Sequence, residues 1–355
     1  MDRIKLGVIG CGVIGRAHIQ AAVDLPRVEV VAVADFVPAA AESAAEMVPG
    51  VTVYGSGDEL IERAAVDAVV LAMPTSARTE LPKLAIRHGK HVLLEKPPAM
   101  NAEALREIAA LGSDRLVACA SSRFRHYESA RFATRFLAEE SLGPIRLVRF
   151  RGISAPSPKP EKAPPVWRLR RDLNGGGILV NWGVYDLDYL LGLLGFRLRP
   201  TTVLARTWGV PKHMAPWVAP DSDAEIHAAA FMQCEGGAAI QLERAEHTPA
   251  PAEAVWHIVG ERGGLRLTML GGDEKQIILD RIDDKEGLVS ETIWSGQEPW
   301  NTLHAGPIGN LADAILDGSK VATGLAEAIQ LQEVLDAINA SSDQGRPITM
   351  TDTSS

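Results

Sequence analysis

The sequence contains few cysteines, few aromatic residues and no long apolar run, and these scarcities exclude several classes of protein. Its three cysteines, Cys11, Cys119 and Cys234, lie far apart without a CxxC spacing, which argues against a disulfide framework and a structural zinc site. No apolar stretch approaches the roughly 20 residues that cross a bilayer. Lys and Arg number 36 against 45 Asp and Glu, so the net charge of −9 argues against nucleic acid as a partner. The N-terminus enters an apolar segment without a basic leader, so a cytoplasmic location is expected.

The length and composition predict a globular protein of two domains. The chain has 355 residues, of which 46% are hydrophobic and 23% charged. Within residues 1–121, short apolar runs alternate with helical patterns, which is typical of a doubly wound parallel sheet. We expect strands at residues 5–9, 28–34, 51–54, 66–72, 91–94 and 116–120, with helices from residue 13 and at 39–47, 80–88 and 102–111. Residues 56–59 fit a capping box that opens one more helix.

The pattern changes near residues 120–123, where we expect a hinge. Residues 122–355 are predicted to form an α+β domain with an open, mostly antiparallel sheet, because longer strands follow one another with few helices between them. The expected strands lie at 145–152, 202–207, 225–233, 238–243, 255–260 and 265–269. Helices are expected at 129–139, 308–315 and 325–340, the last two closing the chain.

A glycine-rich turn at residues 10–15 predicts a dinucleotide site. Its sequence is GxGxxG, directly after one predicted strand and before a helix. Gly10 permits a tight turn, Gly12 admits a pyrophosphate close to the backbone, and Gly15 allows the helix to pack on the strand. The first turn of the helix then offers N–H groups and partial positive charge to the phosphates.

Asp35 predicts NAD rather than NADP as the cofactor. It lies twenty residues after Gly15 at the end of the second predicted strand, where a carboxylate accepts the ribose hydroxyls and repels a 2′-phosphate. No arginine follows it before Arg63. The alternative, in which Asp35 caps the helix that starts near Pro38, is compatible with a ribose contact.

With Glu95-Lys96-Pro97, about 80 residues beyond the glycine turn, the chain resembles the Gfo/Idh/MocA oxidoreductases. Supporting segments are Gly15-Arg16-Ala17-His18, Asp67-Ala68-Val69-Val70, Gly89-Lys90-His91-Val92 and Gly175-Gly176-Gly177. The resemblance covers essentially the whole chain. It implies a Rossmann domain, an open-sheet domain, a nicotinamide cofactor, and oxidation or reduction at a secondary carbon of a sugar, cyclitol or glycoside.

The resemblance also implies three catalytic residues. Lys96 takes the place of the family lysine near the nicotinamide, and an ammonium at the carboxyl end of a strand can stabilise an alkoxide. Family members usually carry Asp and His, four residues apart, on the helix after the three glycines, whereas this chain has Asn181 and Tyr185. The spacing places both on one face of an α-helix. Tyr185 can then transfer a proton and Asn181 can orient a hydroxyl, although Tyr185 as a packing residue is the alternative.

Further contacts follow from the same resemblance. The residues predicted to bind the cofactor are Gly10, Gly12, Val13, Ile14, Gly15, Asp35, Met73, Pro74, Thr75, Glu95, Lys96, Ser121, Trp167 and Arg168. Those predicted to bind the substrate are Lys96, Arg123, Asn181, Tyr185, Arg78 and His247. Arg78 stands where the family commonly has His, and its fork of donors suits vicinal hydroxyls or a carboxylate.

Two functions are consistent with these residues. One is an oxidoreductase acting on a small polyhydroxylated molecule, with the nicotinamide cofactor either exchanged or retained between turnovers. The other is an NAD-binding sensor without catalysis, because the Asp and His pair is missing. No metal is expected, since no His, Asp and Glu residues have metal-ligand spacing. By resemblance, a homodimer or homotetramer forms through the sheet of the second domain.

Overall fold

The computed structural model describes residues 2–139, 141–162 and 164–350. The last five residues of the predicted second domain, 351–355, lie outside the described part. The chain divides into two compact units. The first unit comprises Met1–Arg123 and Asn301–Ile329, and the second comprises Phe124–Trp300 and Gln330–Ser355.

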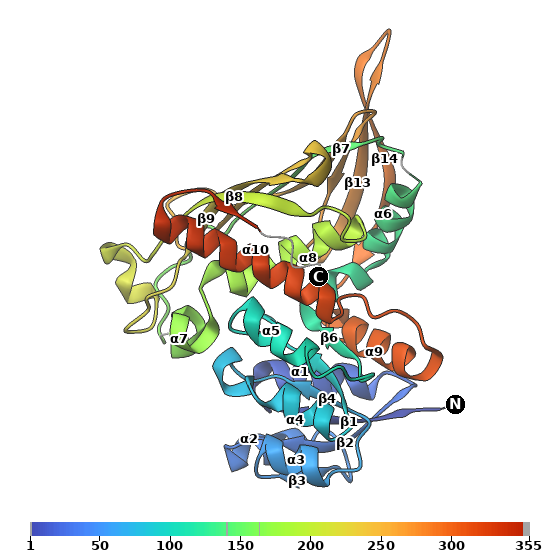
Figure 1. The fold of residues 1–355 in the computed structure, drawn as a ribbon, viewed down its shortest axis with the longest axis vertical. Coiled ribbons are helices and arrows are strands. Elements are labelled where there is room, and N and C mark those ends of the chain that lie inside the picture. The colour runs from blue at the N-terminus through green and yellow to red at the C-terminus, as the bar shows by residue number, and fades with distance from the viewer. Residues whose placement is uncertain (1, 140, 163, 351–355) are drawn as a thin grey trace. The chain divides into compact units, whose positions relative to one another are not determined.

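The first unit is built on a six-stranded, entirely parallel sheet (Figure 1). Its strand order is β3-β2-β1-β4-β5-β6, so the order reverses between β1 and β4, where ligands bind in folds of this kind. The strands are β1 (Ile4–Ile9), β2 (Val28–Ala34), β3 (Thr52–Tyr54), β4 (Ala68–Leu71), β5 (His91–Leu94) and β6 (Val117–Cys119). The predicted doubly wound sheet is confirmed.

Helices alternate with these strands as predicted. They are α1 (Val13–Val23), α2 (Pro38–Ala45), α3 (Gly57–Arg63), α4 (Leu81–Arg87) and α5 (Ala102–Ala109), with the 3-10 helices η1 (Thr75–Arg78) and η2 (Ala120–His126). Ser56 caps α3 by accepting the N–H of Glu59 at 3.1 Å, which confirms the Ser56 half of the predicted capping box, while the Glu59 carboxylate accepts the N–H of Gly55 at 3.3 Å.

One helix from the end of the chain belongs to the first unit, in contrast to the predicted division at residue 121. Ile308 and Leu311 of α9 (Ala305–Asp317) are buried in one core cluster with Val8 and Ile19. Arg27 also donates to Asp313 at 2.6 Å. The spacing of the apolar residues in α9 predicts a helix with one apolar face. It does not predict which of the two cores that face packs against.

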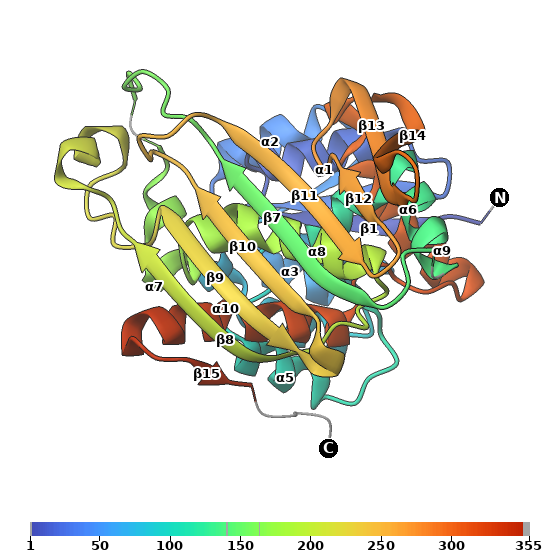
Figure 2. The same ribbon diagram turned by 90° about the horizontal axis from the view of Figure 1, so that it is seen from above.

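The second unit contains a nine-stranded mixed sheet in the order β14-β13-β12-β11-β7-β10-β9-β8-β15 (Figure 2). The pair β7–β10 is parallel and the other pairs are antiparallel, which confirms the mostly antiparallel sheet. The strands are β7 (Ile145–Ile153), β8 (Pro200–Trp208), β9 (His227–Cys234), β10 (Ala239–Ala245), β11 (Glu253–Gly260), β12 (Gly264–Leu267), β13 (Gly272–Asp283), β14 (Gly287–Glu298) and β15 (Ile348–Thr349). Its helices include α6 (Glu128–Ala138), α7 (Arg171–Asn174) and α8 (Val184–Leu193), and the division between the units falls within α10 (Leu325–Gln344).

The long hairpin β13–β14 has no counterpart among the predicted strands. Along β14, exposed and half-buried residues follow one another without regular alternation, and only its last residue, Glu298, is buried. A strand at the edge of a sheet with both faces largely in solvent needs no apolar stripe, so its sequence carries no period of two. Its pairing with β13 is a tertiary feature.

Candidate functional site

The glycine turn at residues 10–15 forms a cradle at the carboxyl end of β1. Gly10 has φ +90°, and a Cβ on Gly15 would lie 1.8 Å from the Gly10 carbonyl oxygen, so both glycines are required by the turn itself. A Cβ on Gly12 would meet no atom within 4 Å. Gly12 therefore leaves open space next to the start of α1, which suits a pyrophosphate. Val13, 76% exposed, and Ile14 are apolar residues left uncovered there.

Asp35 lies where a ribose-binding carboxylate is expected. Its Oδ2 accepts the N–H of Cys11 at 2.7 Å and its Oδ1 accepts the N–H of Val37 at 2.9 Å, so the carboxylate is held at the end of β2. It lines a pocket of about 370 Å³ together with Gly10, Phe36, Asp58, Met73 and Glu80, among other residues. None of the lining residues is Lys or Arg. This acidic pocket fits an adenosine with a free 2′-hydroxyl and disfavours a 2′-phosphate.

Cys11, inside the phosphate turn, is a buried free cysteine. Burial and the neighbouring Asp35 carboxylate raise the pKa of its thiol to about 11. A thiol that stays protonated is a poor nucleophile, so Cys11 fills space in the turn rather than acting as a redox group.

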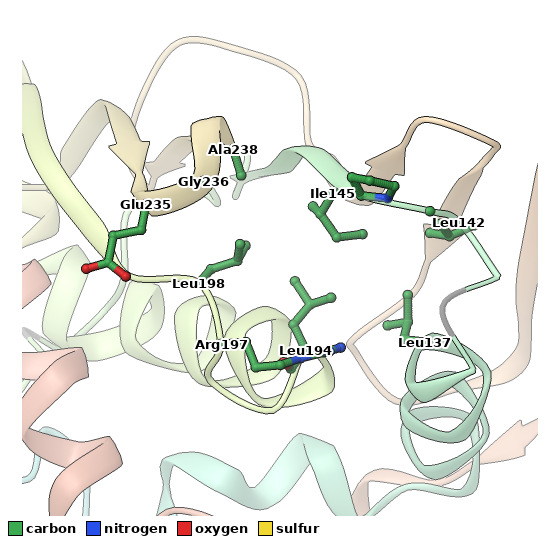
Figure 3. Close-up of a pocket in the computed structure, with 11 residues that line it drawn as sticks. Leu137, Leu142, Ile145, Leu194, Arg197, Leu198, Glu235, Gly236 and Ala238 are labelled. Atoms are coloured by element: carbon green, nitrogen blue, oxygen red, sulfur yellow. The ribbon is translucent and has the colours of Figure 1, made fainter.

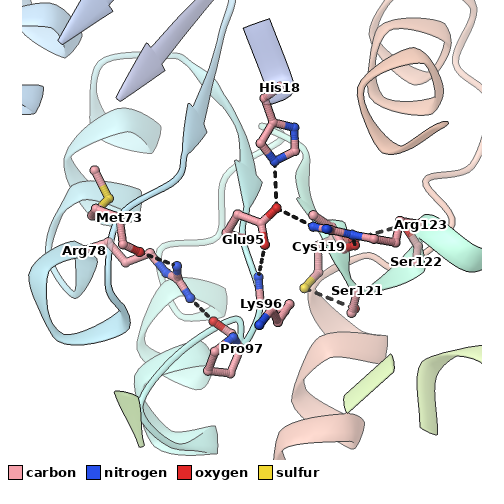
Figure 4. Close-up of polar contacts among 11 residues, drawn as sticks. His18, Met73, Arg78, Glu95, Lys96, Pro97, Cys119, Ser121, Ser122 and Arg123 are labelled. Atoms are coloured by element: carbon pink, nitrogen blue, oxygen red, sulfur yellow. Dashed lines mark hydrogen bonds and ion pairs between the residues drawn. The ribbon is translucent and has the colours of Figure 1, made fainter. Parts of the chain in front are cut away.

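Lys96 follows the carboxyl end of β5, beside a buried polar network (Figure 4). Glu95 Oε1 contacts His18 Nε2 at 2.7 Å and also accepts from the Arg123 guanidinium, while Oε2 accepts the N–H of Lys96 at 3.0 Å. Burial raises the pKa of Glu95, but Arg123 and His18 outweigh it and hold the pKa well below its usual value. Ser121 is also buried and donates to Cys119 Sγ at 3.2 Å.

Arg78, which is predicted to bind the substrate, is buried. Only 2% of the residue is exposed, and its guanidinium donates to the Met73 carbonyl at 2.9 Å and to the Pro97 carbonyl. The nitrogen that donates to Pro97, Nη2, also lies 3.5 Å from Thr75 Oγ1. These contacts engage the guanidinium with main chain at the ends of β4 and β5, so the geometry favours a structural role.

In the second unit, Asn181 lies within a π-helix and Tyr185 follows it in the first turn of α8. Residues Leu179–Gly183 form this π-helix, η4, directly before α8. Asn181 Nδ2 donates to the Arg168 carbonyl at 2.9 Å, and its Oδ1 accepts from Asn174 at 3.1 Å. The Tyr185 ring instead packs edge-on against Phe124, with ring centres 5.3 Å apart. Single-sequence spacing does not reveal the π-turn, and the common face of Asn181 and Tyr185 stays a prediction.

The predicted Trp167-Arg168 pair lies in the 3-10 helix η3 (Val166–Leu169). Arg168 forms a bidentate pair with Glu246, at 2.9 and 2.5 Å, so part of its donor capacity is used within the protein. His247 follows Glu246 with φ +51°, a left-handed conformation that is uncommon outside glycine. Cofactor binding by Arg168 and substrate binding by His247 stay predictions.

A buried cluster beneath α8 was not found from the sequence. Asp186 accepts from Trp256 Nε1 at 2.9 Å and lies 3.4 Å from Arg244, whose guanidinium also covers the Trp182 ring at 4.9 Å. Burial raises the pKa of Asp186 to about 6, although Arg244 and Trp256 act in the opposite direction. Trp182 in turn contacts Tyr185. The residues of this cluster come from three separate segments of the chain. No local pattern in the sequence therefore predicts that they meet.

His18, Glu95 and His304 each place a potential ligand atom within 4.8 Å of the others. Glu95 Oε1 already contacts His18 and the Arg123 guanidinium, and a cation bound there would face that positive charge. Burial, then Arg123, lowers the pKa of His304 to about 3. His18, Glu95 and Arg123 thus form a hydrogen-bonded network, and the His304 ring packs edge-on against His18, with ring centres 4.9 Å apart.

The second unit has a separate pocket of about 330 Å³, lined mainly by apolar side chains (Figure 3). Leu137, Leu142, Ile145, Leu194 and Leu198 surround it, with Arg197 and Glu235 as its charged members. None of the predicted site residues lines it.

A parallel sheet with a glycine cradle at its switch point and an acid at the end of β2 defines a dinucleotide-binding Rossmann protein. The chain belongs to the Gfo/Idh/MocA family: residues 4–121 match the model described as "Oxidoreductase family, NAD-binding Rossmann fold", and residues 130–266 match the GFO/IDH/MocA C-terminal domain. The resemblance inferred from the sequence is confirmed, as is NAD as the cofactor of the first unit.

The relatives include enzymes acting on sugars and cyclitols. A dTDP-3,4-didehydro-2,6-dideoxy-alpha-D-glucose 3-reductase of Saccharopolyspora spinosa is 30% identical over 67% of each chain. One of the same name from Streptomyces violaceoruber is 34% identical over 55% of this chain and 56% of the relative. Inositol 2-dehydrogenase of Rhizobium meliloti (strain 1021) is 32% identical over 54% of this chain and 55% of the relative. The chain thus spans little more than half the length of the last two.

Solved structures share the fold over nearly the whole chain. An NAD binding oxidoreductase from Klebsiella pneumoniae has a TM-score of 0.84 at 24% identity, covering 98% of this chain and 99% of that one. Levoglucosan dehydrogenase in complex with NADH and L-sorbose has a TM-score of 0.84 at 18% identity, covering 99% and 100%. At these identities the likeness establishes the fold alone. Within the described residues, no helix combines the length and apolar character needed to cross a membrane.

Proposed function

We propose that this protein is an NAD-dependent oxidoreductase that interconverts a secondary alcohol and a ketone on a sugar, cyclitol or glycoside. The observation that carries the proposal is the open space at Gly12, at the same edge of the sheet as Lys96 after β5. The carboxyl ends of parallel strands meet at that edge, where folds of this kind bind a dinucleotide. The names of the sugar reductases and the inositol dehydrogenase among the relatives support the substrate class.

The residues present fit NAD. Gly12 and the first turn of α1 would receive the pyrophosphate, and Asp35 would accept the hydroxyls of the adenosine ribose. Asp35, Asp58 and Glu80 in the pocket favour NAD over NADP, because each repels an added phosphate. When bound, the nicotinamide would supply the two-electron chemistry, as the acceptor of a hydride from the carbinol carbon in oxidation and its donor in reduction.

Lys96 and Tyr185 carry the proton and charge chemistry in this proposal. Lys96 stabilises the negative charge that develops on the substrate oxygen. Tyr185 takes the hydroxyl proton during oxidation and returns it during reduction. Asn181 donates a hydrogen bond to the Arg168 carbonyl, and this bond stabilises the η4 segment next to Tyr185. Asn181 thus has a structural role besides its proposed role in orienting the substrate hydroxyl.

The decisive test replaces the two groups one at a time. Lys96→Met and Tyr185→Phe should each lower kcat by about 100-fold or more, measured as NADH formation over a panel of pyranoses, inositols and glycosides. Tyr189→Phe is the matched control, because Tyr189 lies one turn further along α8 and is equally buried. NAD binding without turnover of any panel member by the unmodified protein would contradict the enzymatic proposal and favour a sensor.

A further inference from the structure

The main chain around Lys96 is held on both sides by buried side chains (Figure 4). On one side, Glu95 Oε2 accepts the N–H of Lys96 at 3.0 Å. On the other side, the Arg78 guanidinium donates to the Pro97 carbonyl. Because Arg78 also donates to the Met73 carbonyl at 2.9 Å, it ties the segment after β5 to the end of β4. The backbone of Lys96 is therefore restrained before and after the residue.

Glu95 is itself fixed by two other elements. His18 of α1 contacts its Oε1 at 2.7 Å, and Arg123 of η2 donates to the same oxygen. His18 is fully buried and Glu95 is 5% exposed, so neither side chain can leave this arrangement without disturbing the core. The carboxylate is thus a fixed charge and not a mobile surface group.

Several elements of the first unit contribute charged or titratable groups around Glu95. The charged groups are Arg78 on η1 and Arg123 on η2. The other titratable groups there are His18 on α1, His304 directly before α9, and the Cys119 thiol of β6 beside Arg78. Burial lowers the pKa of Arg78 to about 10, which still leaves it charged at neutral pH. Burying such a charge costs free energy, and an apolar side chain would fill the space without that cost. The guanidinium is therefore expected to serve a purpose beyond packing.

We infer that Arg78 and Glu95 are positioning residues for Lys96: both hold its main chain, and the Glu95 carboxylate places a fixed negative charge beside it. The inference rests on the catalytic role proposed above for Lys96. It replaces the substrate contact that the sequence analysis assigned to Arg78. Replacing either side chain should change the kinetics through Lys96, without any contact between that side chain and the substrate.

Glu95→Gln tests the electrostatic part. Gln keeps an acceptor for the N–H of Lys96 but removes the negative charge, so the Lys96 amine should lose its proton at lower pH. The alkaline limb of the kcat/KM profile should then move to lower pH by about one unit. Glu298→Gln is the matched control, because Glu298 is as buried and also pairs with a lysine, Lys275, in the second unit. That control should lower the melting temperature without moving the limb.

Arg78→Lys tests the geometric part, and it carries the test alone if Glu95→Gln does not fold. A lysine keeps the charge but cannot reach both carbonyls with a planar fork. We expect kcat to fall about tenfold, with KM for the substrate within about twofold and the alkaline limb unmoved. A rise in KM at constant kcat would instead identify Arg78 as a substrate ligand and overturn the inference.

Lys96→Met separates this inference from the proposed function. If Lys96→Met is fully active, the role of Lys96 is wrong and the proposed mechanism fails. If Lys96→Met is inactive while Glu95→Gln keeps the pH profile of the unmodified protein and Arg78→Lys keeps its kcat, the mechanism stands and the positioning role is refuted.

Discussion

At the scale of single residues, Asp35 connects the end of β2 to the choice of cofactor. Both of its oxygens accept main-chain N–H groups, from Cys11 and Val37, so the carboxylate is held rigidly in the acidic pocket. Because the Asp35 carboxylate cannot turn away, it should repel a bound 2′-phosphate more strongly than a mobile carboxylate would.

Asp35→Asn should therefore change cofactor selectivity. The amide keeps one acceptor but loses the charge, so kcat/KM with NAD should fall about tenfold or more while NADP becomes a better competitor. Steady-state kinetics with both cofactors measures the ratio. Asp67→Asn is the control, since Asp67 also accepts a main-chain N–H, from Lys5 at 2.7 Å, but precedes β4. An unchanged NAD to NADP ratio in Asp35→Asn would refute the assignment.

His304 should make the protein sensitive to acid. Burial lowers its pKa from 6.5 to about 3, so the unfolded chain binds a proton that the folded chain does not. The free energy of unfolding then decreases as the pH falls from 6.5 toward 3. His304→Phe should remove about 3 kcal/mol of the loss between pH 7 and pH 4, measured by urea unfolding. His88→Gln, at an exposed position, should leave the loss unchanged. Equal losses in His304→Phe and the unmodified protein would count against the buried neutral form.

At the scale of elements, the connection from β1 to α1 shows that identical residues can have different tasks. Gly15 is required because a side chain would overlap the Gly10 carbonyl, whereas Gly12 faces open space. Gly15 is therefore needed for the fold, whereas Gly12 is needed for the ligand.

This difference can be measured with a pair of alanine variants. Gly12→Ala should fold with an unchanged melting temperature but bind NAD at least tenfold more weakly, because its Cβ occupies the space for the pyrophosphate. Gly15→Ala should lose about 2 kcal/mol or more of stability through the backbone overlap. Calorimetric titration and thermal unfolding separate the two effects. Normal NAD affinity in Gly12→Ala would place the cofactor elsewhere.

At the scale of the whole molecule, the second unit presents a sheet face with exposed apolar side chains. Leu204 of β8 and Phe231 of β9 are cross-strand partners and both are half-exposed. Paired apolar side chains on an open sheet are typical of an interface between copies of a chain. This supports the predicted homo-oligomer, which stays a proposal.

A double substitution should test that surface. Leu204→Asp with Phe231→Asp should convert the oligomer to monomers, as determined by light scattering after size-exclusion chromatography, because two buried carboxylates would oppose association. Ile282→Asp on β13 is the control, being 84% exposed but remote in the strand order. A mass unchanged by the double substitution would exclude this face as the interface.

The parallel sheet of residues 4–119 and its cofactor follow from local patterns in the chain. Strand β2 and strand β5 begin and end as predicted, and the glycine turn and Asp35 lie at the ends of β1 and β2. These features depend on contacts between residues that are close in the sequence. The spacing of apolar residues and the residue types in the turns are therefore enough to predict them.

Only the tertiary structure decided the rest. It assigned α9 to the first unit, paired β13 with β14, inserted the π-turn before Tyr185 and buried Arg78 against the Pro97 carbonyl. It also joined His18, Glu95 and Arg123 from three segments of the first unit. The physical reason is that desolvation and charge pairing depend on distance in space, and distance in space between remote segments is not encoded in any local pattern.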